Sequence, residues 1–213
     1  MLLGLLLAVL GIASEIAHSP SVSSLSVTAN SITLTVPIDI VGAQTLVLAE
    51  WQRSIDQAWN LGNDGQPFVF CGKRVIFDAR FNPLPAVRTP KTTHLVIVRD
   101  VGAGEPFVSS VWHVLGTSPS YSPRTGYWGS NINGGTSAHE FGHLLGLLDE
   151  YVDTNAGELR QPGERPSPDV RRFPDAPFSL MATDRGVVLQ RHIREVLRMH
   201  GIDAAAACAD GSR

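Results

Sequence analysis

The spacing of apolar residues changes twice along the first half of the chain, and this change constrains the fold more than any other feature. Residues 31–40 alternate polar and apolar positions, which is typical of a half-buried strand. From Gln44 to Asn60 the period becomes helical, and one face collects Leu46, Val47, Trp51, Ile55, Ala58 and Trp59. Strand patterns return at 73–81, 93–99, 108–115 and 126–132.

The second half of the chain predicts two more helices, over 137–145 and over 187–200. Between them, residues 152–178 are rich in proline, glycine and charge and predict a long loop. We therefore expect an α/β (α+β) fold, a twisted mixed sheet of four to five strands backed by helices. A helix over 137–145, capped by Thr136 or Ser137, would precede a small irregular C-terminal lobe with the final helix.

Composition limits the number of domains and the class of partner. The chain has 213 residues, of which 43% are hydrophobic and 17% charged, and this suits one domain over 19–213. We expect an N-terminal lobe over about 30–146 and a C-terminal lobe over about 147–213. The formal net charge of -3 and the lack of a basic run argue against a nucleic-acid partner. We expect a monomer.

Residues 1–18 begin with an unbroken apolar run, which is shorter than the ~20 residues that a membrane-spanning helix needs. The run has the length of a signal-peptide core, although no basic residue precedes it. The alternatives are a buried N-terminal helix and a start codon placed inside a longer leader. We favour a secreted, extracellular protein that has no membrane contact in its mature form. Cys71 and Cys208 would then be able to pair, or would remain free thiols.

The residues with the clearest chemistry are His139-Glu140-Phe141-Gly142-His143. On a helix, two histidines four positions apart lie on one face and can reach a single ion. Zinc accepts imidazole nitrogens and often keeps one open position for water. Glu140 could take a proton from that water and pass it to a leaving amine.

The residues after His143 supply a third ligand. Gly146 can adopt a positive φ and end the helix, so that the chain turns back. Asp149 would then meet the ion as an oxygen ligand. Glu150 is a rival third ligand, and Glu195 on the last helix is another. Tyr151 could donate a hydrogen bond near the ligands or pack beneath the helix.

These residues together resemble the metzincin zinc peptidases, whose signature is His-Glu-x-x-His-x-x-Gly-x-x followed by a third ligand. The ligand is aspartate in the snapalysin-like branch, as at Asp149. The resemblance covers roughly residues 30 to 200 and includes a methionine turn, matched by Met181 within residues 178–183. It implies a metalloendopeptidase that cleaves polypeptide substrates, with one catalytic Zn²⁺ and Glu140 as general base.

Two alternatives stay open: a zinc-stabilised binding module without turnover, and a gluzincin-type peptidase that uses a distant glutamate. In the related fold the strand before the metal helix borders the cleft and pairs with extended substrate. The resemblance therefore makes Tyr127, Trp128 and Gly129 candidate substrate-binding residues, with plain packing as the alternative. His192 and His200 are expected at the surface of the last helix. Acidic residues within 152–178 match no EF-hand spacing, so calcium is a possibility without support.

Overall fold

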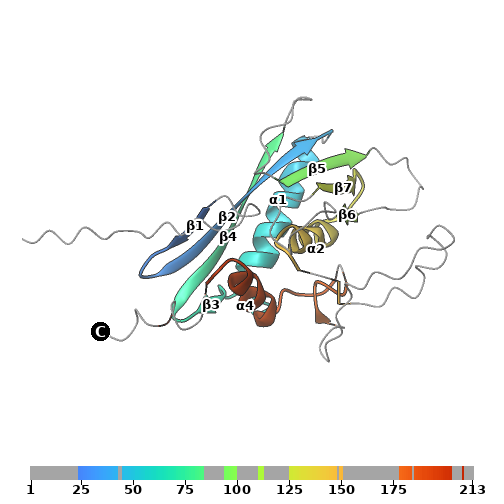
Figure 1. Ribbon diagram of the computed structural model, residues 1–213. Coiled ribbons are helices and arrows are strands. Elements are labelled where there is room, and N and C mark those ends of the chain that lie inside the picture. The colour runs from blue at the N-terminus through green and yellow to red at the C-terminus, as the bar shows by residue number, and fades with distance from the viewer. Residues whose placement is uncertain are drawn as a thin grey trace, which may run out of the picture.

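The computed structural model describes residues 24–42, 45–83, 94–99, 110–112, 125–147, 149–150, 178–183, 185–202 and 208. Within these ranges the fold is mixed α/β, as predicted (Figure 1). The strands are β1 (Ser24–Val27), β2 (Ser31–Val41), β3 (Val69–Phe70), β4 (Lys73–Pro83), β5 (His94–Arg99), β6 (Ser110–Trp112) and β7 (Thr125–Gly129). The helices are α1 (Thr45–Asn60), α2 (Gly134–Leu144) and α4 (Gln190–Met199).

The strands form one mixed sheet in the order β3-β4-β2-β5-β7-β6, with β1 paired to β2. The pairs β2–β4, β2–β5 and β5–β7 are parallel, whereas β1–β2, β3–β4 and β6–β7 are antiparallel. The described residues thus form a 7-stranded sheet, and it contains a strand in each of the five regions where the sequence predicts one. The two further strands, β1 and β3, have 4 and 2 residues, too few for a periodic pattern to show.

Helix α1 connects the parallel neighbours β2 and β4 and packs against the sheet, as a crossover helix does. Its predicted apolar face is in the core, where Trp51, Ile55 and Trp59 are fully buried. The Trp59 indole N–H donates to the carbonyl of Ala138 at 2.9 Å, and the Trp51 indole N–H donates to the carbonyl of Ile132 at 3.2 Å. Helix α1 therefore makes one buried hydrogen bond to α2 and one to Ile132, just before the N-cap of α2.

Helix α2 begins earlier than the sequence suggested. Its N-cap is Asn133, whose side-chain oxygen accepts the backbone N–H of Thr136 at 2.9 Å. The expected cap at Thr136 or Ser137 was wrong, because both residues lie inside the first helical turn. The Ser137 hydroxyl instead donates to the carbonyl of Gly134 at 2.8 Å.

Helix α4 belongs to the same hydrophobic core as the sheet. Its buried residues Ile193, Val196 and Leu197 join one cluster with the apolar residues of β2 and α1. A disulfide between Cys71 and Cys208 links the β3–β4 turn to the segment beyond α4, so the paired alternative holds. Among the described residues, no helix combines the length and apolar character needed to cross a membrane.

Candidate metal centre

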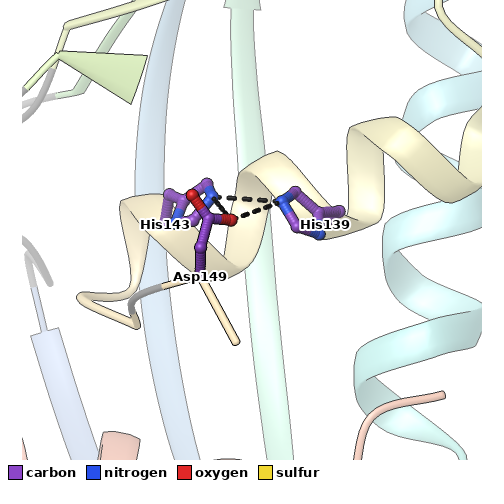
Figure 2. Close-up of side chains that lie close together, drawn as sticks. All are labelled: His139, His143 and Asp149. Carbon is purple, nitrogen blue, oxygen red and sulfur yellow. Dashed lines mark hydrogen bonds and ion pairs between the residues drawn. The ribbon is translucent and has the colours of Figure 1, made fainter. Parts of the chain in front are cut away.

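Helix α2 brings His139 and His143 together one turn apart, as the sequence predicted. Their Nε2 atoms lie 3.1 Å from each other, and both side chains point to the same side of the helix (Figure 2). The helix is buried along most of its length, and His139 is 8% exposed. Its packing against α1 therefore fixes the direction in which the two imidazoles project.

The chain leaves α2 through a Schellman turn centred on Gly146. Gly146 has φ of 106°, in the left-handed region that favours glycine, as expected. The N–H of Leu147 donates to the carbonyl of Gly142 at 3.0 Å, and the N–H of Gly146 donates to the carbonyl of His143 at 3.0 Å. This reversal returns the chain towards the two histidines and places Asp149 beside them.

Asp149 completes a nearly equilateral triangle of potential ligand atoms. Its Oδ1 atom lies 3.2 Å from His139 Nε2 and 3.1 Å from His143 Nε2. Within the described part of the chain, these three residues form a group that could hold a metal ion. Figure 2 shows all three side chains converging on one point.

The other ring nitrogen of each histidine is held by a backbone carbonyl. His139 Nδ1 lies 2.6 Å from the carbonyl oxygen of Leu180, and His143 Nδ1 lies 3.0 Å from that of Leu147. A carbonyl can only accept, so each Nδ1 must carry a proton. In the neutral rings both Nε2 atoms then present lone pairs to Asp149, an arrangement that a cation at the centre stabilises.

The triangle fits a small divalent metal ion. Bonds of ~2.0–2.1 Å to a tetrahedral zinc would separate the ligand atoms by about 3.3–3.4 Å, slightly more than the separations found here. Asp149 Oδ1 is buried and lacks a well-directed hydrogen bond among the described residues, as expected of an atom that binds a metal. Two imidazoles and one carboxylate leave room for a water or substrate oxygen.

Without a metal, the cluster attracts positive charge. Burial lowers the pKa of His143, but the approach of Asp149 and the charge of Glu140 outweigh burial, and the pKa rises above its ordinary value. Burial raises the pKa of Asp149, but His139 and His143 outweigh it and hold that pKa far below its usual range. Both shifts show that the centre of the triangle favours a cation.

Glu140 lies beside the triangle on α2 and is 5% exposed. Its negative charge contributes to the raised pKa of His143, so the carboxylate is close to the potential ligands. The carboxylate is not a member of the three-residue group, which agrees with the sequence expectation that it is not a ligand. A buried carboxylate beside a metal is well placed to accept a proton.

The turn around Met181 packs against the residues of the candidate site. Met181 is fully buried, and its sulfur lies against Gly142, where a Cβ atom would collide with it. The neighbouring carbonyl of Leu180 holds the His139 ring, and the carbonyl of Met181 accepts the N–H of Glu150 at 2.9 Å. The turn thus contacts both the metal helix and the segment that carries Asp149.

Glu150, the rival third ligand, lies outside the three-residue group, and residues of α4 contact its carboxylate. Oε2 accepts from Arg191 at 2.8 Å, and Oε1 lies 3.2 Å from His192 Nε2. Burial raises the pKa of Glu150, but His192, Ser179 and Arg191 outweigh it and lower that pKa. Glu195, the other rival, is also outside the metal group.

Two of the candidate substrate-binding residues of β7, Trp128 and Gly129, are buried. Trp128 is fully buried, and its ring packs edge-on against Trp51 with centroids 5.2 Å apart. Gly129 is also buried, and β6 covers the outer side of β7 as far as Tyr127. Of the two roles that the sequence left open for Trp128, substrate contact and packing, its burial favours packing. Tyr151 lies outside the described residues.

Two histidines that sequence reasoning assigned to the surface are buried. His192 is 1% exposed and His200 is 2% exposed. The N–H of Leu189 donates to His192 Nδ1 at 3.0 Å, so this ring caps the start of α4 and carries its proton on Nε2. The sequence did contain a signal for this role. His192 is the third residue of the helix, and the side chain at that position often accepts the backbone N–H of the N-cap residue.

Comparison with known proteins assigns no family to the chain. No protein-family model matches the chain, and no curated protein matches it.

Proposed function

We propose that this chain is a zinc-dependent endopeptidase of metzincin type, with His139, His143 and Asp149 as metal ligands and Glu140 as general base. The observation that carries the proposal is the triangle of His139 Nε2, His143 Nε2 and Asp149 Oδ1, with sides of 3.1–3.2 Å. Glu140 beside it supports catalysis rather than a purely structural ion, because a structural site needs no extra buried carboxylate.

A zinc ion in this position would supply a Lewis acid that acidifies water towards a pKa of ~7 and polarises a peptide carbonyl. Glu140 would take the proton from the attacking water and deliver it to the nitrogen of the departing amine. The carbonyls of Leu180 and Leu147 keep each Nδ1 protonated, and so keep both Nε2 atoms available as ligands. The gluzincin alternative loses support, because Glu195 lies outside the metal group.

The test combines metal analysis of the purified protein with cleavage of a peptide library, with and without chelator. We expect one zinc per chain, endoproteolytic cleavage, and loss of cleavage with chelator that zinc restores. Glu140→Gln should retain the metal and lose cleavage, because the amide cannot accept the proton. Unchanged cleavage in that variant would contradict the mechanism.

The same experiment separates the remaining alternatives. Zinc binding without cleavage of any peptide would indicate a zinc-stabilised binding module. Iron in place of zinc would indicate different chemistry, because two histidines and one carboxylate also form the facial triad of iron(II) oxygenases. Metal analysis therefore precedes the activity assay.

A further inference from the structure

The carboxylate of Glu150 lies between the metal cluster and α4 and has its own set of buried partners. Glu150 directly follows Asp149, yet the two side chains contact different groups: Asp149 lies against the two histidines, and Glu150 lies against Arg191 and His192. Glu150 is 6% exposed, so its charge is largely removed from water. A buried carboxylate is retained only where donors compensate it.

The donors that hold Glu150 are oriented by their own hydrogen bonds. His192 Nδ1 accepts the N–H of Leu189, so Nε2–H points towards Glu150 Oε1 at 3.2 Å. Ser179 Oγ lies 3.2 Å from the same nitrogen and accepts the N–H of Met181 at 3.1 Å. This tautomer makes His192 a donor here and not a base that could activate Ser179.

The same hydrogen-bond network connects to the candidate metal site at two residues, His139 and Asp149. Glu150 donates its backbone N–H to the carbonyl of Met181, and the preceding carbonyl of Leu180 accepts from His139 Nδ1. The turn that contains Leu180 and Met181 therefore fixes the ring of His139. The same turn and α4 together hold Glu150, the residue that follows Asp149. Neither Asp149 nor His139 can shift without disturbing these contacts.

We infer that Glu150 is a positioning residue that places Asp149 against His139 and His143, so that contacts with α4 set the strength of metal binding. The inference rests on the proposed metal site but not on peptidase activity. Groups that orient metal ligands typically change metal affinity by ~10- to 100-fold when they are removed. The network adds no ligand of its own; it limits how far the third ligand can move.

Glu150→Gln tests the inference with little change in volume. The amide must turn its NH₂ group towards either Arg191 or His192, both of which are donors, so one contact becomes repulsive. We expect Zn²⁺ affinity, measured by competition with a chromophoric chelator, to fall by about 10- to 100-fold. The visible absorption of the Co²⁺-loaded protein should also change, because Asp149 would no longer be held in one geometry.

Lys73→Met is the matched control, because it also removes a buried charge with hydrogen bonds, and the hydrogen-bond partners of Lys73 belong to neither the candidate metal site nor the contacts of Glu150. Lys73 is 6% exposed and donates to the carbonyls of Thr28 and Ala29 at 2.9 and 3.2 Å. We expect this variant to lose stability and to keep the wild-type Zn²⁺ affinity and Co²⁺ spectrum. Equal affinities in Glu150→Gln and Lys73→Met would overturn the inference.

Arg191→Gln is the second variant, and it tests the positioning role of Glu150 if Glu150→Gln fails to fold. Arg191 is 25% exposed in its side chain, so its loss is better tolerated, and we expect a smaller fall in Zn²⁺ affinity in the same direction. Unchanged affinity there would overturn the inference. A wild-type protein that binds Zn²⁺ but cleaves no peptide would contradict the proposed function and leave the positioning role intact.

Discussion

The sulfur of Met181 occupies the space that a side chain on Gly142 would need. A Cβ atom on Gly142 would collide with that sulfur and lie 3.0 Å from the ring of Trp59. In the sequence, Gly142 lies between the two histidines of the candidate metal site, and Met181 is fully buried. The contact lets the Met181 turn approach the helix closely, and so brings the carbonyl of Leu180 within reach of His139.

Gly142→Ala should therefore destabilise the protein, although alanine is the better helix former. Overpacking costs about 1–3 kcal/mol, and the helix propensity of alanine returns up to about 1 kcal/mol. We expect a net loss of about 1–2 kcal/mol in the free energy of unfolding, measured by urea titration. In a Met181→Ala background the added methyl fills vacated space, so the same change should become neutral or stabilising. Additive effects of the two substitutions would contradict the packing argument.

Local spacing was sufficient to predict that His139, His143 and Asp149 lie together. The helical repeat places His139 beside His143, and Gly146 permits the turn that returns Asp149, so all three positions depend on nearby residues. The strands 31–40 and 73–81 and the helix 44–60 were predicted for the same reason. Each of these elements carries its own apolar pattern within a short window.

Long-range pairing explains what the sequence could not show. Glu150 appeared as a rival ligand because its donors, Arg191 and His192, are 41 and 42 residues away. His192 and His200 were placed at the surface because histidine spacing does not reveal burial. The sequence left Trp128 open between substrate contact and packing, because the position of β6 in the sheet cannot be deduced from its three-residue strand.

Asp149→Ala and Glu195→Ala provide a direct comparison of the two possible third ligands. Asp149 Oδ1 lies within 3.2 Å of both histidines, whereas Glu195 is not part of the group. We expect Asp149→Ala to weaken Zn²⁺ binding by more than the ~100-fold that removal of an orienting group can cause. Glu195→Ala should leave the affinity unchanged. The reverse result, measured by metal competition, would favour the gluzincin arrangement.

His200 should make stability depend on pH in the mildly acidic range. Burial lowers the pKa of His200 to about 4, against a partly compensating hydrogen bond with the backbone of Leu145. Between about pH 6.5 and pH 4 the unfolded state binds a proton that the folded state does not, so stability falls as the pH falls through this window. Below about pH 4 both states are protonated, and this contribution stops changing.

The expected size of this contribution is on the order of 3 kcal/mol between pH 7 and pH 4. His200→Gln removes the titrating group, so its unfolding free energy should fall less over the same range. Urea titrations at both pH values, with chelator in every sample, keep metal release out of the comparison. Parallel pH profiles for the wild type and the variant would show that His200 is not buried as a neutral ring.

The disulfide should contribute to stability without controlling the metal centre. Cys71 and Cys208 are separated by 137 residues. Closing a loop of this length lowers the entropy of the unfolded chain, and so raises its free energy by up to about 5 kcal/mol at 25 °C. We expect the double variant Cys71→Ala/Cys208→Ala to lose a few kcal/mol of unfolding free energy. Its Zn²⁺ affinity should stay at the wild-type value, because neither cysteine belongs to the network around Asp149 and Glu150. A large fall in affinity would show instead that the link between the β3–β4 turn and the segment beyond α4 also fixes the position of α4.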